Sequence, residues 1–310
     1  MTGAADQRPI GVFDSGIGGL TVMRAVAGRL PGERLIYLGD TARVPYGTKS
    51  AATVTRYATQ CADFLLGRGI KALVVACNTA SALAIDSLRE RMAAAGIPVL
   101  GVIEPGAVEA CRVSRHGRVG VIGTSSTLRS GAYARAIAAI RPDFTVVGAA
   151  CPLFVPLAEE GWVGAQDDVA LSVARRYLQP LLAADVDTLI LGCTHYPLLR
   201  GVIEKVMPGA ALVDSGAAVA GDLERALARL GLAAPEKAGG AAREARGATA
   251  TDPGATRQAE YHVTDDPDRF REVGERFLGH PIGGPHLADL IDLTGESAGL
   301  TTDSAGDRRR

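Results

Sequence analysis

Short apolar runs alternate along the chain with longer segments in which apolar residues recur every three or four positions. The runs are rich in Val, Ile and Leu and are bounded by Gly, Asp or Pro, which is typical of buried strands. They predict strands at 10–14, 34–40, 71–76, 98–102, 118–123, 144–150, 187–192, 211–214 and 261–265. The helical periodicity predicts helices in most of the gaps, for example at 50–68, 81–95, 126–140, 166–184 and 216–231.

This alternation predicts an α/β fold with mostly parallel sheets that are covered by helices on both faces. Two echoes within the sequence add to that picture. "KALVVACNTAS" at 71–81 resembles "DTLILGCTHYP" at 187–197, and "FDSG" at 13–16 resembles "VDSG" at 213–216. Chance can produce either echo, because strand ends favour small polar residues. Both together favour two related, pseudo-symmetric α/β halves.

Composition and charge narrow the class of ligand. The chain has 310 residues, 47% of them hydrophobic and 22% charged, and a formal net charge of -1. It has no basic field that would hold nucleic acid or an anionic membrane, so we expect a small-molecule ligand. No apolar run approaches the roughly 20 residues that span a bilayer, and "MTGAADQRPI" lacks a stretch of signal-peptide type. We therefore expect a cytoplasmic protein.

Two segments have little to bury. Residues 234–259 are rich in Ala, Gly and charge, and predict a flexible insertion. The tail at 296–310 is predicted to be disordered.

The chain has five cysteines and no CxxC pair. In a reducing cytosol this count argues against a disulfide framework and against paired zinc ligands. Cys61, Cys111 and Cys151 are best interpreted as packing residues. Cys77 and Cys193 differ, because each ends a buried strand and is followed by polar residues at the expected start of a helix. Backbone N–H groups at such a position stabilise an anion, either a thiolate or a substrate carboxylate.

Two interpretations of this pair remain beside reactive thiols. Cys77 and Cys193 can be core residues that fill space at strand ends, since free cysteine is among the most buried residue types. They can also bind zinc together with His195, although no fourth ligand is evident. Two thiols at equivalent positions in facing halves suit a reaction with two bases on opposite faces of one carbon. Racemisation at a Cα is such a reaction.

Two further segments contain candidate residues. In "FDSGIGGLT" (13–21), a dinucleotide-binding turn is disfavoured because Thr21 replaces the last glycine and Asp14 would face the pyrophosphate. Asp14 and Ser15 are better suited to a substrate ammonium group or to proton traffic at a thiol. The loop "LGDTARVPYGTKS" (38–50) is either a simple connection or a carboxylate site at Tyr46 and Gly47.

The remaining candidates are charged or titratable. Glu159 and Glu160 follow two prolines and can be an ordinary surface pair. His195 can be a satisfied core histidine, but its position two residues after Cys193 also suits proton exchange with that thiol.

Taken together, "IGVFDSGIGGLTV", "LGDTARVPYGTKS", "VVACNTASA", "GVIEPG", "FVPLAEEG" and "LILGCTHYPLL" resemble glutamate racemase of the aspartate/glutamate racemase superfamily. The resemblance runs from about residue 10 to 215, with a weaker match at "YHVTDDPDRFREVGERFLG". It implies interconversion of L-glutamate and D-glutamate without a cofactor or metal, for peptidoglycan synthesis. A racemase of aspartate or a related amino acid, and a non-catalytic amino-acid-binding or protein-interaction role, are the alternatives.

The resemblance also assigns roles to residues. Cys77 would act on D-glutamate and Cys193 on L-glutamate, with Asp14 and Glu159 assisting near Cys77 and His195 near Cys193. The implied substrate-binding residues are Asp14, Ser15, Tyr46, Gly47, Asn78, Thr79, Thr194 and His195.

The family's architecture implies two doubly wound α/β domains with the active site in the cleft between them. The first domain would comprise residues 1–100 and 212–295, and the second 101–211. The implied partner is glutamate, with no nucleic acid and no membrane, and a homodimer is a possible assembly.

Overall fold

The computed structural model describes residues 6–234 and 259–290. Apart from its two end residues, the insertion expected at 234–259 lies outside the described residues, and so does the tail expected at 296–310.

The chain forms two sheets, and every strand pairing within the described residues is parallel. The six-stranded sheet has the order β10-β9-β2-β1-β3-β4 and the four-stranded sheet has the order β6-β5-β7-β8. The strands are β1 (Ile10–Asp14), β2 (Leu35–Gly39), β3 (Ala72–Val75), β4 (Val99–Gly101), β5 (Arg118–Gly123), β6 (Thr145–Ala150), β7 (Thr188–Gly192), β8 (Ala211–Asp214), β9 (Ala259–Val263) and β10 (His286–Leu287). The predicted α/β class with parallel sheets is confirmed.

Helices connect the strands. They are α1 (Leu20–Arg29), α2 (Ala51–Gly67), α3 (Asn78–Ala93), α4 (Ile103–Val113), α5 (Ser125–Arg129), α6 (Ala132–Ile140), α7 (Phe154–Glu159), α8 (Asp168–Ala183), α9 (Arg200–Val206), α10 (Ser215–Leu230) and α12 (Pro267–Leu278). The single helix predicted at 126–140 is two helices, because Gly131 has a left-handed φ of 65° between α5 and α6. None of the described helices is long and apolar enough to cross a bilayer.

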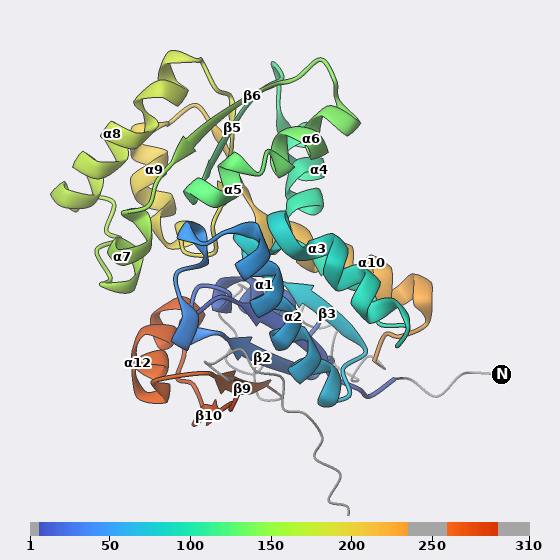
Figure 1. The fold of residues 1–310 in the computed structure, drawn as a ribbon. Coiled ribbons are helices and arrows are strands. Elements are labelled where there is room, and N and C mark those ends of the chain that lie inside the picture. Colours follow the sequence, from blue (N-terminus) through green and yellow to red (C-terminus); the bar gives the residue numbers. More distant parts are fainter. Residues whose placement is uncertain (1–5, 235–258, 291–310) are drawn as a thin grey trace, which may run out of the picture.

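The two sheets share one topology. In each, the first strand pairs with the second on one side and with the third on the other, and the fourth follows outside the third. Figure 1 shows the two sheets as separate bodies, one with α4 to α9 and one with α1, α2 and α12. In parallel sheets of this type, ligands bind at the carboxyl ends of the strands where the strand order reverses. That point lies between β1 and β3 in one sheet and between β5 and β7 in the other.

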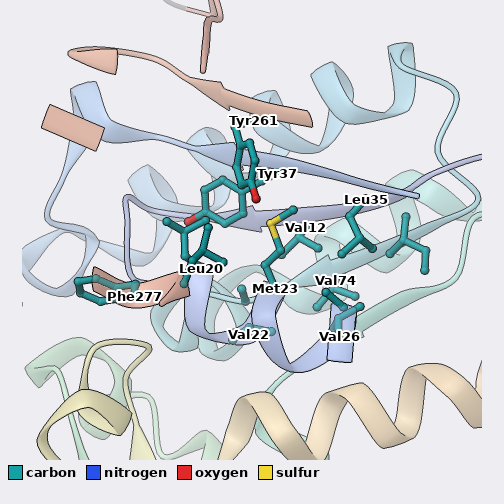
Figure 2. Close-up of a cluster of buried hydrophobic side chains, with 14 of the residues drawn as sticks. Val12, Leu20, Val22, Met23, Val26, Leu35, Tyr37, Val74, Tyr261 and Phe277 are labelled. Atoms are coloured by element: carbon teal, nitrogen blue, oxygen red, sulfur yellow. The ribbon is translucent and has the colours of Figure 1, made fainter. Parts of the chain in front are cut away.

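The core of the six-stranded sheet fixes the position of β1. Leu20, Val22, Met23 and Val26 of α1 pack on the sheet beside Val12 of β1 (Figure 2). Tyr37, Tyr261 and Phe277 extend the same cluster from β2, β9 and α12 (Figure 2). Full burial of one such side chain contributes roughly 1.5–3 kcal/mol, so the strand that ends at Asp14 is held rigidly.

The pairing of β8 bears on the domain boundaries. β8 pairs with β7, with Leu191 opposite Asp214, and therefore belongs to the four-stranded sheet. We propose two domains divided as the family resemblance implies, but with the chain returning to the first domain after Asp214 and not at 211.

Candidate active site

The strand ends bring the two sequence echoes to equivalent places. Asp14 ends β1, and Cys77 lies two residues after β3, its neighbour in the sheet. In the other sheet Thr124 follows β5, and Cys193 follows the neighbouring β7. Each cysteine thus lies at the strand-order reversal of its own sheet.

Cys77 is a buried thiol at the start of a helix. It is the N-cap residue of α3, where its Sγ accepts a hydrogen bond from Ala80 N at 3.5 Å. The thiol donates to Ser15 Oγ at 3.4 Å. Burial, followed by the charge of Asp14, raises the pKa of Cys77 to about 12, although both hydrogen bonds oppose the shift. The thiol form is therefore favoured at neutral pH.

Asp14 supplies a buried carboxylate beside this thiol. Its Oδ2 accepts a hydrogen bond from Gly16 N at 3.0 Å. Its Oδ1 is buried and has no hydrogen-bond partner within residues 6–234 and 259–290. Burial raises the pKa of Asp14, and the nearby His195 partly offsets that rise. A buried acceptor of this kind suits a substrate ammonium group, which would supply the missing donor.

Cys193 has a different neighbour, the imidazole of His195. Its Sγ lies 3.9 Å from His195 Nδ1, and His195 Nε2 donates to Glu159 Oε1 at 3.0 Å. Burial alone would lower the pKa of His195. Its hydrogen bonds to Cys193 and Glu159, together with the charges of both groups, outweigh burial and raise that pKa to about 10. An imidazolium at this position can hold a Cys193 thiolate as an ion pair.

The structure places Glu159 differently from the expectation. The resemblance implies a position near Cys77, whereas the carboxylate hydrogen-bonds His195 on the Cys193 side. Two arginines of α12 also reach Glu159: Arg276 Nη1 donates to its main-chain oxygen at 2.5 Å, and Arg269 Nη2 lies 3.8 Å from Oε2. Glu160 is exposed, so only Glu160 fits the interpretation as a surface residue.

The two halves of the site touch each other. Thr21 Oγ1 donates to the main-chain oxygen of Thr194 at 2.8 Å. A Cβ on Gly18 would lie 2.2 Å from Thr194 Oγ1 and 2.4 Å from His195 Nδ1, so only glycine permits this approach. The charge of Cys193 also contributes to the raised pKa of Cys77. The cysteines therefore belong to a single site.

Asn78 and Thr79 point toward the four-stranded sheet. Asn78 Nδ2 donates to the hydroxyl of Tyr133 at 2.8 Å. Thr79 Oγ1 lies 3.0 Å from Thr124 Oγ1 and 3.1 Å from Thr127 Oγ1. Sequence reasoning singled out neither these threonines nor Tyr133, because they belong to no motif and only the packing of α5 and α6 against α3 brings them here.

The hydroxyl of Tyr46 belongs to a buried hydrogen-bond network and does not face the thiols. Its hydroxyl donates to Asp40 Oδ2, and Asp40 also forms a 2.7 Å ion pair with Arg43. Burial raises the pKa of Tyr46. Any ligand contact of Tyr46 would therefore involve atoms other than the hydroxyl.

Gly47 joins this loop to the other sheet. Ser126 Oγ donates to Gly47 O at 2.8 Å, and a Cβ at Gly47 would lie 2.7 Å from the Cβ of Thr124. The loop therefore closes over the same strand end that bears the threonines.

The zinc interpretation finds no support in this arrangement. Across the described parts of the chain, no group of three or more His, Cys, Asp or Glu side chains is placed to hold a metal ion.

Comparisons with known proteins agree on one family. The sequence profile of the Asp/Glu/Hydantoin racemase family matches residues 15–223. A glutamate racemase of Geobacter metallireducens is 51% identical over 286 residues, covering 91% of this chain and 97% of that protein. The crystal structure of a Thermus thermophilus glutamate racemase in complex with β-chloro-D-alanine has a TM-score of 0.76 and 45% identity, covering 92% and 98% of the two chains. That of a Francisella tularensis glutamate racemase in complex with D-glutamate has a TM-score of 0.80 and 38% identity, with the same coverage.

Proposed function

The chain belongs to the Asp/Glu/Hydantoin racemase family, and we propose that it interconverts L-glutamate and D-glutamate with Cys77 and Cys193 as its two bases. The observation that carries this proposal is the matched placement of the cysteines. Each follows the third strand of its sheet, at the strand-order reversal, and the charge of Cys193 contributes to the raised pKa of Cys77.

The reaction needs one proton removed and one supplied on opposite faces of Cα. A thiolate takes the Cα proton, and the C–H electron pair stays on carbon. The opposite thiol then donates its proton to the other face of that carbon. The products are the other enantiomer, a new thiol and a new thiolate, so protons and charge balance and the enzyme is ready for the reverse reaction.

The surroundings of the thiols suggest how the resting enzyme divides these roles. Asp14 disfavours a second negative charge at Cys77, whereas His195 can hold Cys193 as a thiolate. The resting enzyme would then accept L-glutamate, whose proton Cys193 removes and to which Cys77 donates. A substrate ammonium at Asp14 would offset the negative charge near Cys77 and ease the reaction from D-glutamate.

The carbanion must be stabilised without an electron sink, because the proposed reaction uses no cofactor. Hydrogen-bond donors aimed at the substrate carboxylate can do this in a water-excluded site. The buried start of α3 at Asn78 and Thr79, and Thr194 after β7, offer such donors. Glutamate as substrate is supported by the names of the relatives and by the D-glutamate in the Francisella tularensis structure.

The proposal extends to the role of the enzyme in the cell and to its assembly. A cytoplasmic enzyme with this activity would supply D-glutamate to peptidoglycan synthesis, and a homodimer is its proposed assembly.

The test follows the wild-type protein in D2O without added cofactor. We expect the circular dichroism of L-glutamate to decay to zero while its Cα proton signal disappears. Turnover of aspartate with no inversion or exchange of glutamate would overturn the assignment of glutamate. No exchange with either amino acid would favour the non-catalytic role.

A further inference from the structure

The second "DSG" motif has no role in the proposed mechanism, although its local geometry matches the first. Gly16 N donates to Asp14 Oδ2 at 3.0 Å, and Gly216 N donates to Asp214 Oδ1 at 2.8 Å. In the first turn the central serine, Ser15, receives the hydrogen bond of Cys77. In the second turn the equivalent serine, Ser215, must form its hydrogen bonds with another partner.

That partner is Tyr133 of α6. The Oγ of Ser215 lies 3.0 Å from the Tyr133 hydroxyl and 3.4 Å from the main-chain oxygen of Leu191, to which it donates. The Tyr133 hydroxyl also accepts from Asn78 Nδ2 at 2.8 Å. Tyr133, Ser215 and Asn78 are all at least 95% buried, so water does not compete for these hydrogen bonds.

In the structure Ser215 Oγ donates its single proton to the main-chain oxygen of Leu191. With that bond formed, Ser215 accepts from the Tyr133 hydroxyl, and Tyr133 accepts from Asn78 Nδ2. Burial raises the pKa of Tyr133 to about 12, so its proton is present at neutral pH. The Asn78 amide must therefore turn its nitrogen toward Tyr133 and its carbonyl oxygen away.

This series of hydrogen bonds also connects the two strand ends that bear the cysteines. Asn78 follows Cys77 directly, and Leu191 lies two residues before Cys193. A Cβ on Gly192 would lie 3.2 Å from the Tyr133 ring, so the ring packs closely against the end of β7. No other part of the mechanism assigns a task to this buried polar group.

We infer that Tyr133 and Ser215 are positioning residues that fix the Asn78 amide in the one orientation that binds the substrate. The inference rests on the proposed function. Without the Tyr133 oxygen, the amide loses the acceptor that distinguishes its nitrogen from its oxygen, and it can present either end to the ligand.

The test compares Tyr133→Phe with the wild type in glutamate racemisation. We expect kcat/KM to fall about tenfold, the size of one hydrogen bond to a charged group, mainly through a higher KM. A purely structural defect would lower the active fraction, and hence kcat, at unchanged KM. Tyr177→Phe is the matched control, because that hydroxyl accepts from Leu153 N at 3.3 Å in another part of the fold, and it should leave both constants unchanged.

A double-mutant cycle decides whether Tyr133 acts through Asn78. In an Asn78→Ala background, Tyr133→Phe should cause no further loss, because the amide that it orients is gone. A further tenfold loss would overturn the inference, and so would an unchanged KM in Tyr133→Phe alone. Ser215→Ala keeps the tyrosine and should raise KM by a smaller factor. Failure of the wild type to racemise glutamate would instead overturn the proposed function.

Discussion

Cys77 and Cys193 occupy the same place in two sheets of the same topology, yet their neighbours differ in kind. Cys77 caps α3 and has a hydroxyl and a carboxylate beside it. Cys193 precedes only a short 3-10 helix (Tyr196–Leu199) and has an imidazole that is itself held by a carboxylate. The shared topology thus determines where the two sulfurs lie, and the neighbouring side chains give each sulfur a chemically different environment.

The largest effect is expected from loss of either thiol. Cys77→Ala and Cys193→Ala should each lower kcat/KM for racemisation by about 10³-fold or more, because each would remove one of the two proposed proton-transfer groups. Circular dichroism of glutamate measures the rate. Cys111→Ala, at a partly exposed cysteine outside the site, is the control and should retain wild-type activity. Substantial two-way activity in either active-site variant would refute the two-base assignment.

The next effect tests the contact between the two halves. Gly18→Ala should lower kcat/KM by about 10²-fold, because its Cβ would overlap Thr194 and His195 and a displacement near 1 Å misaligns the site. The control is Gly28→Ala in α1, where a Cβ meets nothing within 4 Å. It should keep full activity and stabilise the fold by roughly 0.5–1 kcal/mol in a denaturation experiment. Equal activity of the two variants would contradict the close approach at Gly18.

A smaller effect distinguishes the two thiols from each other. Glu159→Gln should lower kcat/KM about tenfold, because the imidazolium that faces Cys193 loses its counter-charge. Enantiomers have equal free energy, so kcat/KM must fall equally in both directions. A difference between the two thiols can therefore not appear in kcat/KM. We expect it in the deuterium isotope effect, which should change more for L-glutamate, the substrate assigned to Cys193, than for D-glutamate. An equal change for both enantiomers would contradict the assignment of Glu159 to one side.

The smallest effect concerns stability. Because the folded-state pKa of His195 is raised, its contribution is complete below its unfolded value and is lost as the pH rises toward about 10. Burial raises the pKa of Glu159, but the hydrogen bond and charge of His195 and the charge of Arg269 together outweigh burial and lower it. The contribution of Glu159 is therefore lost as the pH falls below about 4.5. The difference in unfolding free energy between the wild type and Glu159→Gln should thus be largest between about pH 4.5 and 6.5. A difference that does not vary with pH would contradict an ion pair.

The sequence predicts most of the fold because continuous apolar runs identify buried parallel strands. It fails where the signal is short or local. β10 has only two residues, and Gly131 divides a helix whose apolar periodicity continues through the break. The strand expected at 261–265 is found at Ala259–Val263. The displacement is two residues, and a pattern that repeats every two residues does not distinguish the two positions.

For the site, the sequence shows which residues are unusual but not which of them meet. The echo of two strand-end cysteines indicates a pair, and their neighbours in the chain follow. The partner of Glu159, the bond from Tyr46 to Asp40 and the contacts of Thr124 with Thr79 all depend on tertiary packing, which no spacing reveals. The role of the second "DSG" motif, at Ser215, depends in the same way on Tyr133.

The most direct test of two bases on opposite faces is deuterium exchange by the single-cysteine variants. Each variant is incubated in D2O with each enantiomer, and the Cα proton signal is followed. We predict that Cys77→Ala exchanges only L-glutamate and Cys193→Ala only D-glutamate, both without inversion. Exchange of the same enantiomer by both variants, or inversion by either, would contradict the account.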